Sequence, residues 1–268
     1  MRYPKGAIDL RSPQDTLLLQ QVLRSRYVSH EQLWEFLQYK ARESRRRVFN
    51  WRVKRLVDHE LVLRKSVSNR AWIYWVSREG AEHLAGLGEA AAMLVTGGFV
   101  ETRPGPVEHS LELNELQLAL LRGGVTTTWQ SELEIRCLNE FTGYGFCKDY
   151  DAVVKVEGNG RPCTFALEYE RSPKTPKKYA RVRQAVERER HVDCLVYVMP
   201  TYPLLSYVAT FFERCAMPVY FALSDDFRKN ALGTLVMDSR RLRRAALCAV
   251  LDALQQGDMG NDFPLSSF

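Results

Sequence analysis

The chain of 268 residues is long enough for one or two domains with full hydrophobic cores. Its hydrophobic share of 46% and charged share of 26% are ordinary for a soluble globular protein. No apolar run approaches the ~20 residues of a membrane span, and the N-terminus lacks the apolar core of a secretory signal, so we expect no membrane partner. The six cysteines are scattered without a CxxC pair, which predicts a reduced, cytoplasmic protein without a zinc site.

Charge is distributed unevenly along the chain, whose net charge is +6. Residues 1–86 hold 17 Lys and Arg against 9 Asp and Glu, whereas residues 87–268 hold 21 against 23. A basic N-terminal module is therefore joined to a nearly neutral body. This asymmetry predicts a polyanionic partner for the first module only.

The basic module has the pattern of three helices, a two-stranded ribbon and a fourth helix. Apolar residues at helical spacing, with Ser29, Ser44 and Ser77 as predicted N-caps, place these elements. The expected helices and strands are helix 14–25, helix 30–39, helix 45–59, strands 61–65 and 71–76, and helix 78–87.

This order of elements is typical of a winged helix-turn-helix domain, which we place at residues 12–87. The third helix would enter the major groove of double-stranded DNA, where Arg and Asn contact base edges, and the ribbon would contact phosphates. The candidate DNA-binding residues are Ser44, Arg45, Arg46, Arg47, Asn50, Lys54, Lys65 and Arg70.

Three observations leave other interpretations open. The run Arg45-Arg46-Arg47 is also what a solvated helical face looks like. The glycine usual before the wing is Glu60 here, which predicts a distorted turn. The same fold also serves as a protein-interaction module, and a homodimer formed through it is a further expectation.

The rest of the chain predicts a second domain. Residues 88–107 are an expected connector, 108–256 the domain and 257–268 a loose tail. The expected elements are helix 109–122, strand 125–135, a hairpin of strands 151–156 and 164–167, helix 177–190, strand 193–199, helix 204–215, strands 218–223 and 232–237, and helix 240–255. This order predicts a mixed-sheet α/β domain with helices on both faces, as in the restriction-endonuclease-like, or PD-(D/E)xK, fold.

The hairpin carries the candidate site. Asp151 opens its first strand, and Glu168 and Glu170 close the second. Residues two apart in a strand point to the same face, so both glutamates project together. Lysines 177 and 178 follow at once. Three carboxylates beside lysines are how a site holds a divalent metal against a phosphate.

These features together resemble the replication-relaxation family. The resemblance covers roughly residues 12–200 and rests on the N-terminal module, the helix HSLELNELQLALL, Trp129 to Glu132, Asp151, and the Glu168-Tyr169-Glu170 run. Members of that family are associated with replication or mobilisation of mobile DNA elements. Two departures are Tyr150 in place of proline and Glu170 in place of aspartate.

The resemblance implies a metal-dependent site. Asp151 and Glu168 would coordinate Mg²⁺, the implied cofactor, through oxygen ligands. Glu170 would be a further ligand or hold a lysine in place. The third position of the nuclease Glu-x-Lys signature is acidic here, so the lysine would come from the following helix, as Lys177 or Lys178.

Two classes of function follow. The first is a metal-dependent DNA endonuclease or nickase, targeted by its winged helix. The second is a non-catalytic DNA-binding protein, either a transcription regulator or an accessory factor with an inactive nuclease-like domain. On the plainer interpretation, Asp151 simply ends its strand, Glu170 forms an ordinary ion pair with Arg171, and the lysines are a solvated helix start.

Overall fold

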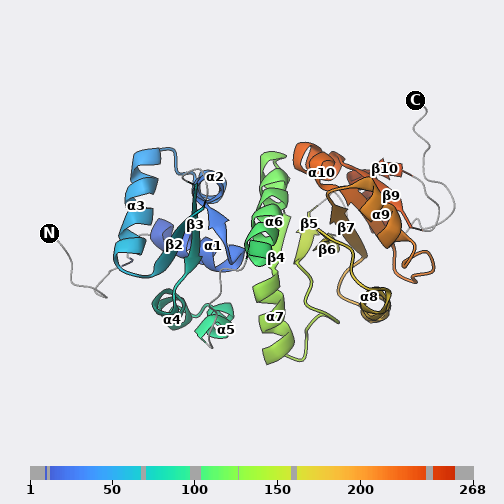
Figure 1. The fold of residues 1–268 in the computed structure, drawn as a ribbon, viewed down its shortest axis with the longest axis horizontal. Coiled ribbons are helices and arrows are strands. Elements are labelled where there is room, and N and C mark those ends of the chain that lie inside the picture. The colour runs from blue at the N-terminus through green and yellow to red at the C-terminus, as the bar shows by residue number, and fades with distance from the viewer. Residues whose placement is uncertain are drawn as a thin grey trace. The chain divides into compact units, whose positions relative to one another are not determined.

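The computed structural model describes residue 10 and residues 13–67, 71–96, 104–125, 127–157, 162–239 and 244–256. Contacts between residues divide the chain into two compact units, Met1–Leu118 and Ala119–Phe268 (Figure 1). The boundary falls inside helix α6 (Pro104–Arg122), which the sequence had assigned to the second domain. Within the described ranges, none of the helices is both long and apolar enough to cross a membrane.

The first unit contains one antiparallel sheet with the strand order β1-β3-β2. Its elements before α6 are α1 (Pro13–Ser25), β1 (Val28–Ser29), α2 (His30–Ala41), α3 (Arg46–Asp58), β2 (Val62–Val67), β3 (Ala71–Val76), α4 (Arg78–Gly86), the 3-10 helix η2 (Ala90–Ala92) and α5 (Met93–Thr96). The helices and the ribbon lie where the sequence predicted them. Strand β1, which pairs with β3, was not predicted.

Local side-chain chemistry explains where these helices begin. Ser29 caps α2 in a capping box, because its side chain accepts from the Gln32 backbone N–H while the Gln32 side chain accepts from the Ser29 N–H. The predicted cap of α3 is wrong: the N-cap is Arg45, which makes no side-chain capping bond, and Ser44 lies before it. Ser77 caps α4 as predicted.

The turn before β2 has the geometry that a glycine would favour. Glu60 adopts a φ of 62°, in the left-handed region. The turn closes normally, since the Leu61 N–H donates to the Leu56 carbonyl at 3.0 Å. Gly80 of α4 lies so close to this turn that a Cβ would overlap the Leu61 carbonyl oxygen. The predicted distortion is therefore confined to one residue.

A buried carboxylate ties α1 to α3 in the first unit. Asp15 is 1% exposed. Arg52 donates to its Oδ1 at 2.6 Å and Arg55 to its Oδ2 at 3.3 Å, both from α3. These two arginines therefore face the interior of the unit, which leaves the opposite side of α3 to carry its exposed cations.

The second unit is a mixed α/β fold around a seven-stranded sheet of order β10-β9-β8-β7-β6-β5-β4. Its elements are β4 (Thr127–Ser131), α7 (Glu132–Phe141), β5 (Ala152–Val156), β6 (Cys163–Tyr169), α8 (Pro176–Arg188), β7 (Cys194–Met199), α9 (Tyr202–Ala209), β8 (Val219–Leu223), α10 (Ser224–Asn230), the 3-10 helix η3 (Ala231–Gly233), β9 (Leu235–Asp238), β10 (Arg244–Ala246) and α11 (Leu247–Gln256). Strands β6, β7 and β8 run parallel, and the other pairs are antiparallel. The predicted mixed-sheet α/β class is confirmed.

Three predicted elements of this unit are wrong in part, and helix α10 was not predicted. The expected helix 204–215 ends at Ala209. The expected strand 125–135 ends at Ser131, because Ser131 and Glu134 form a capping box that starts α7. The expected helix 240–255 begins only at Leu247, after strand β10. The hairpin turn at 158–161, the segment 97–103 of the expected connector and the tail 257–268 lie outside the described residues.

Candidate functional site

One face of the second sheet presents the predicted carboxylates. Side chains alternate along β6, so Ala166 and Glu168 share a face. Ala166 lies opposite Val153 of β5, and Glu168 lies beside Tyr197 of β7. Helices α7, α8 and α9 cover this face, since their buried side chains belong to the same apolar cluster as Val153, Ala166 and Tyr197.

The three predicted carboxylates gather at one end of β5 and β6. Asp151 directly precedes β5, and its Oδ2 accepts from the Tyr169 backbone N–H at 2.7 Å. Glu168 and Glu170 are 5% and 4% exposed. The Glu170 N–H donates to the Val198 carbonyl of β7 at 3.0 Å, which fixes the strand end.

Two lysines reach these carboxylates, and neither is a lysine that the sequence selected. Lys148, from the loop before β5, forms an ion pair with Glu168 and is largely buried. Lys174, from the loop before α8, pairs with Glu170 at 2.9 Å. Lys177 and Lys178 lie exposed in the first turn of α8. The lysines of these two ion pairs thus come from the loops and not from the helix.

Burial and the neighbouring charges shift the pKa values of this cluster. Burial raises the pKa of Glu168, as does the charge of Asp151, against the opposing effect of Lys148. Burial lowers the pKa of Lys174, but its bond to Glu170 and the surrounding carboxylates raise it more, so the net shift is upward. Burial and the same carboxylates raise the pKa of Tyr197, whose hydroxyl has no hydrogen-bond partner among the described residues.

The raised pKa of Glu168 gives a pH-dependent prediction. From the ordinary value of 4.5 up to the raised value, the folded chain binds more protons than the unfolded chain, so this contribution to stability falls as pH rises. We expect Glu168→Gln to remove that slope. Urea unfolding of both proteins from about pH 4.5 to about pH 8 measures it. Glu140→Gln, at an exposed ion pair, should keep the wild-type slope; equal slopes for all three proteins would contradict the prediction.

The same contacts decide whether Mg²⁺ fits the cluster. Mg²⁺ requires oxygen ligands at ~2.0–2.1 Å in near-octahedral geometry. Glu168 and Glu170 are instead ion-paired with ammonium groups. Across the described ranges, no group of three or more His, Cys, Asp or Glu side chains is arranged to hold a metal ion. In this arrangement the residues do not fit the implied metal.

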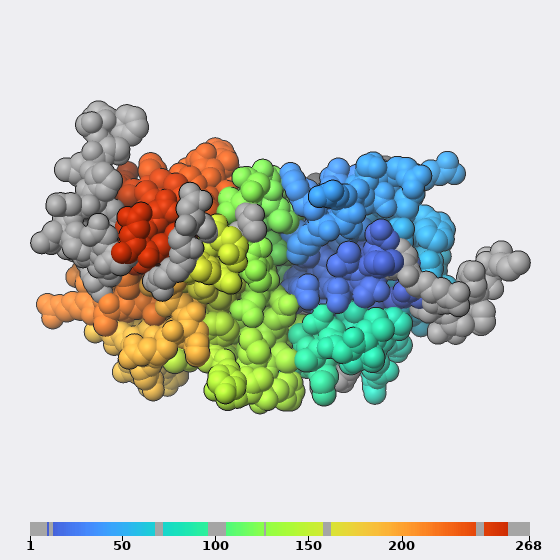
Figure 2. All heavy atoms as spheres, turned by 180° about the vertical axis from the view of Figure 1, so that it is seen from behind, coloured from blue at the N-terminus to red at the C-terminus, as the bar shows by residue number. Residues whose placement is uncertain are grey.

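The first unit carries the second candidate site, on α3 and β2. Figure 2 shows residues of α2 and α3, in light blue, at the surface of this unit. Six of the eight DNA-binding candidates are exposed there: Ser44, Arg45, Arg47, Asn50, Lys54 and Lys65. Lys54 pairs with Asp58, but the side chains are 71% and 55% exposed, so the pair is weak. Arg70 lies outside the described residues.

Two candidates on α3 are held by neighbouring side chains. Arg46 is ion-paired with Glu31, and its guanidinium lies 5.2 Å from the ring centroid of Trp34. Asn50 Oδ1 lies 3.0 Å from His30 Nε2. Burial lowers the pKa of His30, which favours a neutral imidazole that can accept a hydrogen bond at one nitrogen. Arg46 is thus less available to a ligand than the other candidates.

The ribbon adds a cation that sequence reasoning did not select. Arg64 is exposed on β2, and its guanidinium lies 4.3 Å from the ring centroid of Trp72. Stacking on an aromatic face orients a guanidinium while leaving its N–H groups available. Arg64 lies directly opposite Tyr74, so Trp72 is its diagonal neighbour across the ribbon. The register of the two predicted strands could have identified this contact from the sequence.

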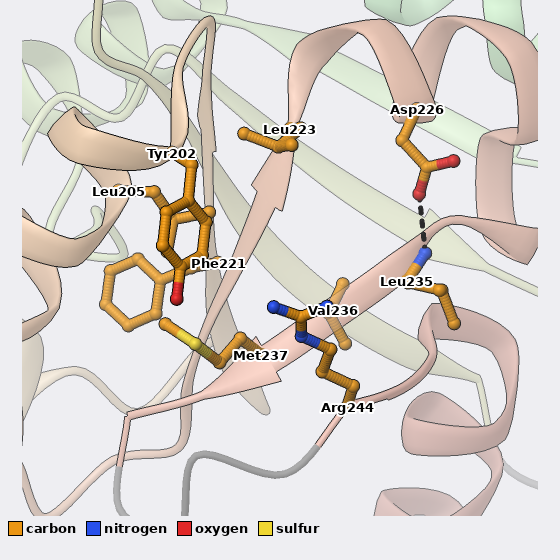
Figure 3. Close-up of a pocket in the computed structure, with 9 residues that line it drawn as sticks. All are labelled: Tyr202, Leu205, Phe221, Leu223, Asp226, Leu235, Val236, Met237 and Arg244. Carbon is orange, nitrogen blue, oxygen red and sulfur yellow. Dashed lines mark hydrogen bonds between the residues drawn. The ribbon is translucent and has the colours of Figure 1, made fainter. Parts of the chain in front are cut away.

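A pocket of about 370 Å³ opens over β8 and β9 of the second sheet (Figure 3). It lies on the same face as Glu168, because Phe221 and Met237 follow Tyr197 in register from strand to strand. Its wall is mostly apolar, with Phe221 and Met237 among the lining residues. Arg244 extends toward Tyr202, 6.0 Å from the ring centroid, and Asp226 accepts from the Leu235 N–H at 2.8 Å. None of the predicted site residues lines this pocket.

Comparison with known proteins adds little to this geometry. No protein-family model matches the chain, and no curated protein matches it. Among solved structures, the restriction endonuclease FokI is similar at a TM-score of 0.31 and 10% sequence identity. That match covers 84% of this chain and 45% of the FokI chain, so this chain spans less than half of that enzyme. A likeness at this level supports no inference about the activity of this chain.

Proposed function

We propose that the chain is a DNA-binding protein whose first unit is a winged helix-turn-helix. Helix α3 would enter the major groove, and strand β2 would contact phosphates. The observation that carries this proposal is the cluster of exposed cations and Asn50 on α3 and β2, in a module with an excess of eight positive charges. Arg52 and Arg55 are turned inward onto Asp15, so the exposed cations occupy one side of α3.

We assign the protein to the accessory factors or regulators of mobile-element replication or mobilisation. The resemblance of residues 12–200 to the replication-relaxation family supports this class. The second unit would be a restriction-endonuclease-like domain, occupying residues 108–256, that contacts DNA or protein without cleaving. Ion pairing of Glu168 and Glu170 with lysines favours this non-catalytic form. All six cysteines lie in the described part of the chain and none forms a disulfide, which fits a cytoplasmic setting.

Binding to duplex DNA across salt concentrations tests the proposal. Phosphate contacts make the affinity fall steeply with salt. If Asn50 contacts bases, Asn50→Ala should weaken binding to a duplex selected from a random pool by ~1–3 kcal/mol, and Arg46→Ala by less because Arg46 is already paired. Unchanged affinity for both variants would refute the groove assignment. Sedimentation with and without DNA would detect the homodimer that we also propose.

A second candidate function is a metal-dependent endonuclease or nickase. The favouring observation is that Asp151, Glu168 and Glu170 meet at one end of the sheet. Incubation of supercoiled plasmid with Mg²⁺ or Mn²⁺ tests it. If the protein is an endonuclease, the wild type should give nicked or linear plasmid. The variants Asp151→Ala and Glu168→Ala should give neither product while they still bind DNA. The non-catalytic form predicts no product and unchanged affinity in both variants.

A further inference from the structure

The carboxylate cluster of the second unit contains its own cation. Glu168 is buried on the sheet face under α8, and the ammonium group paired with it belongs to Lys148. The Lys148 Nζ also donates to the Asp149 carbonyl at 3.0 Å and lies 4.6 Å from the ring centroid of Tyr150. We propose that Lys148 is a built-in counter-ion that takes the place of a divalent cation, so that the native chain excludes Mg²⁺ and Mn²⁺ unless Lys148 leaves Glu168.

Cys147, just before Lys148, and Tyr150, two residues after it, both bind one buried carboxylate. Glu189, just after α8, accepts from the Cys147 N–H at 2.8 Å and from the Tyr150 hydroxyl at 3.3 Å, both through Oε2. Its other oxygen accepts from the backbone N–H groups that follow it, at 2.8 and 2.9 Å. The Cys147 backbone and the Tyr150 ring are therefore held, which fixes the two groups between which Lys148 lies.

The start of the same loop is fastened independently. Asn139 of α7 accepts from the Phe146 N–H at 2.6 Å and donates to Asp149 Oδ1 at 2.6 Å. At Gly145 a Cβ would overlap the Asn139 side chain, so the loop approaches α7 as closely as glycine allows. A loop ordered at this many points presents Lys148 in one place rather than as a mobile surface lysine.

Electrostatics then favours the internal ammonium group over an incoming ion. Lys174 supplies a second positive charge at Glu170, 2.9 Å from its Oε2. A divalent ion entering beside Glu168 would be repelled by both ammonium groups or would have to expel Lys148 from the loop. Mg²⁺ also loses its hydration waters reluctantly. Because a covalently attached cation loses little translational freedom on pairing, the lysine holds the site at ordinary ion concentrations.

This inference does not depend on DNA binding by the first unit. It concerns the second candidate function, because an endonuclease acting through Asp151 and Glu168 would require Lys148 to be displaced first. A failure of DNA binding would leave the counter-ion role intact, and binding of Mn²⁺ by the native chain would leave the DNA-binding proposal intact.

Titration of the full chain with manganese chloride alone tests the inference, with electron paramagnetic resonance counting bound ions. We expect no stoichiometric binding by the wild type. Lys148→Met keeps an aliphatic side chain over the Tyr150 ring but removes the positive charge. Because that charge no longer repels the ion, the variant should bind one Mn²⁺ with an affinity at least about tenfold higher than that of the wild type. Adding Glu168→Gln to that variant should abolish the gain. Lys155→Met, at an exposed lysine of β5, should behave as wild type.

Two results would overturn the inference. One is a wild-type site for one Mn²⁺ that Glu168→Gln removes, and the other is a folded Lys148→Met protein that gains no ion. If Lys148→Met does not fold, nuclear magnetic resonance of the native chain with Mn²⁺ provides the test. Paramagnetic broadening of the Glu168 and Tyr197 resonances would refute the counter-ion role, and sharp resonances would support it.

Discussion

Replacement of Asp15 by alanine is expected to remove about 3–5 kcal/mol from the free energy of unfolding of the first unit. Asp15 is 1% exposed, and two guanidinium groups from α3 converge on its oxygens. The substitution leaves Arg52 and Arg55 largely buried with positive charges that have lost this carboxylate. Removing one partner of a buried ion pair costs more than the pair contributes, because the remaining charge stays desolvated.

Tryptophan fluorescence during urea unfolding can measure this effect in the full chain. Four of the five tryptophans, Trp34, Trp51, Trp72 and Trp75, lie in the first unit, so the signal reports mainly on that unit. The control is Asp58→Ala, which breaks an exposed ion pair on α3 and should cost less than about 1 kcal/mol. Similar losses in the two variants would contradict the buried-pair argument.

Local signals in the sequence predicted much of the fold. Ser29 and Gln32 are three residues apart, so the start of α2 follows from local spacing. The two strands of the ribbon are also close in the sequence, so their pairing follows from local spacing too. The capping box at Ser131 and Glu134 was equally local and could have ended the predicted strand at the right residue. The placement of Glu168 and Glu170 on one side of the strand end followed from the two-residue period of a strand.

Contacts between distant segments could not be predicted in this way. Lys148 meets Glu168 because Asn139 and Glu189, on two different helices or their ends, fix the loop between α7 and β5. No spacing in the sequence encodes that path. The sequence pointed to the lysines of the nearest basic segment, whereas the structure brings Lys148 from the loop before β5 and Lys174 from the loop before α8.

The largest expected effect on ligand binding comes from removing four exposed cations of the first unit together. The variant replaces Arg45, Arg47, Lys54 and Lys65 with alanine; all four are exposed before α3, on α3 or on β2. The salt slope is the slope of the logarithm of the affinity against the logarithm of the salt concentration. Each lost phosphate contact should lower its magnitude by about 1, so four lost contacts should lower it by about 4. Affinity for a random-sequence duplex at low salt should then fall about 100-fold or more.

Net charge alone could produce part of such a loss, so the control must remove the same charge elsewhere. Alanine at the exposed cations Arg136, Lys155, Arg188 and Lys229 of the second unit does this. Fluorescence anisotropy of a labelled duplex, measured from low to physiological salt, compares the two proteins. A contact surface on α3 and β2 predicts a much larger change of slope in the first variant, because counterion release counts only phosphates in direct contact. Equal changes would mean that the duplex responds to overall charge or to contacts with the second unit, and the α3 surface would lose its assigned role.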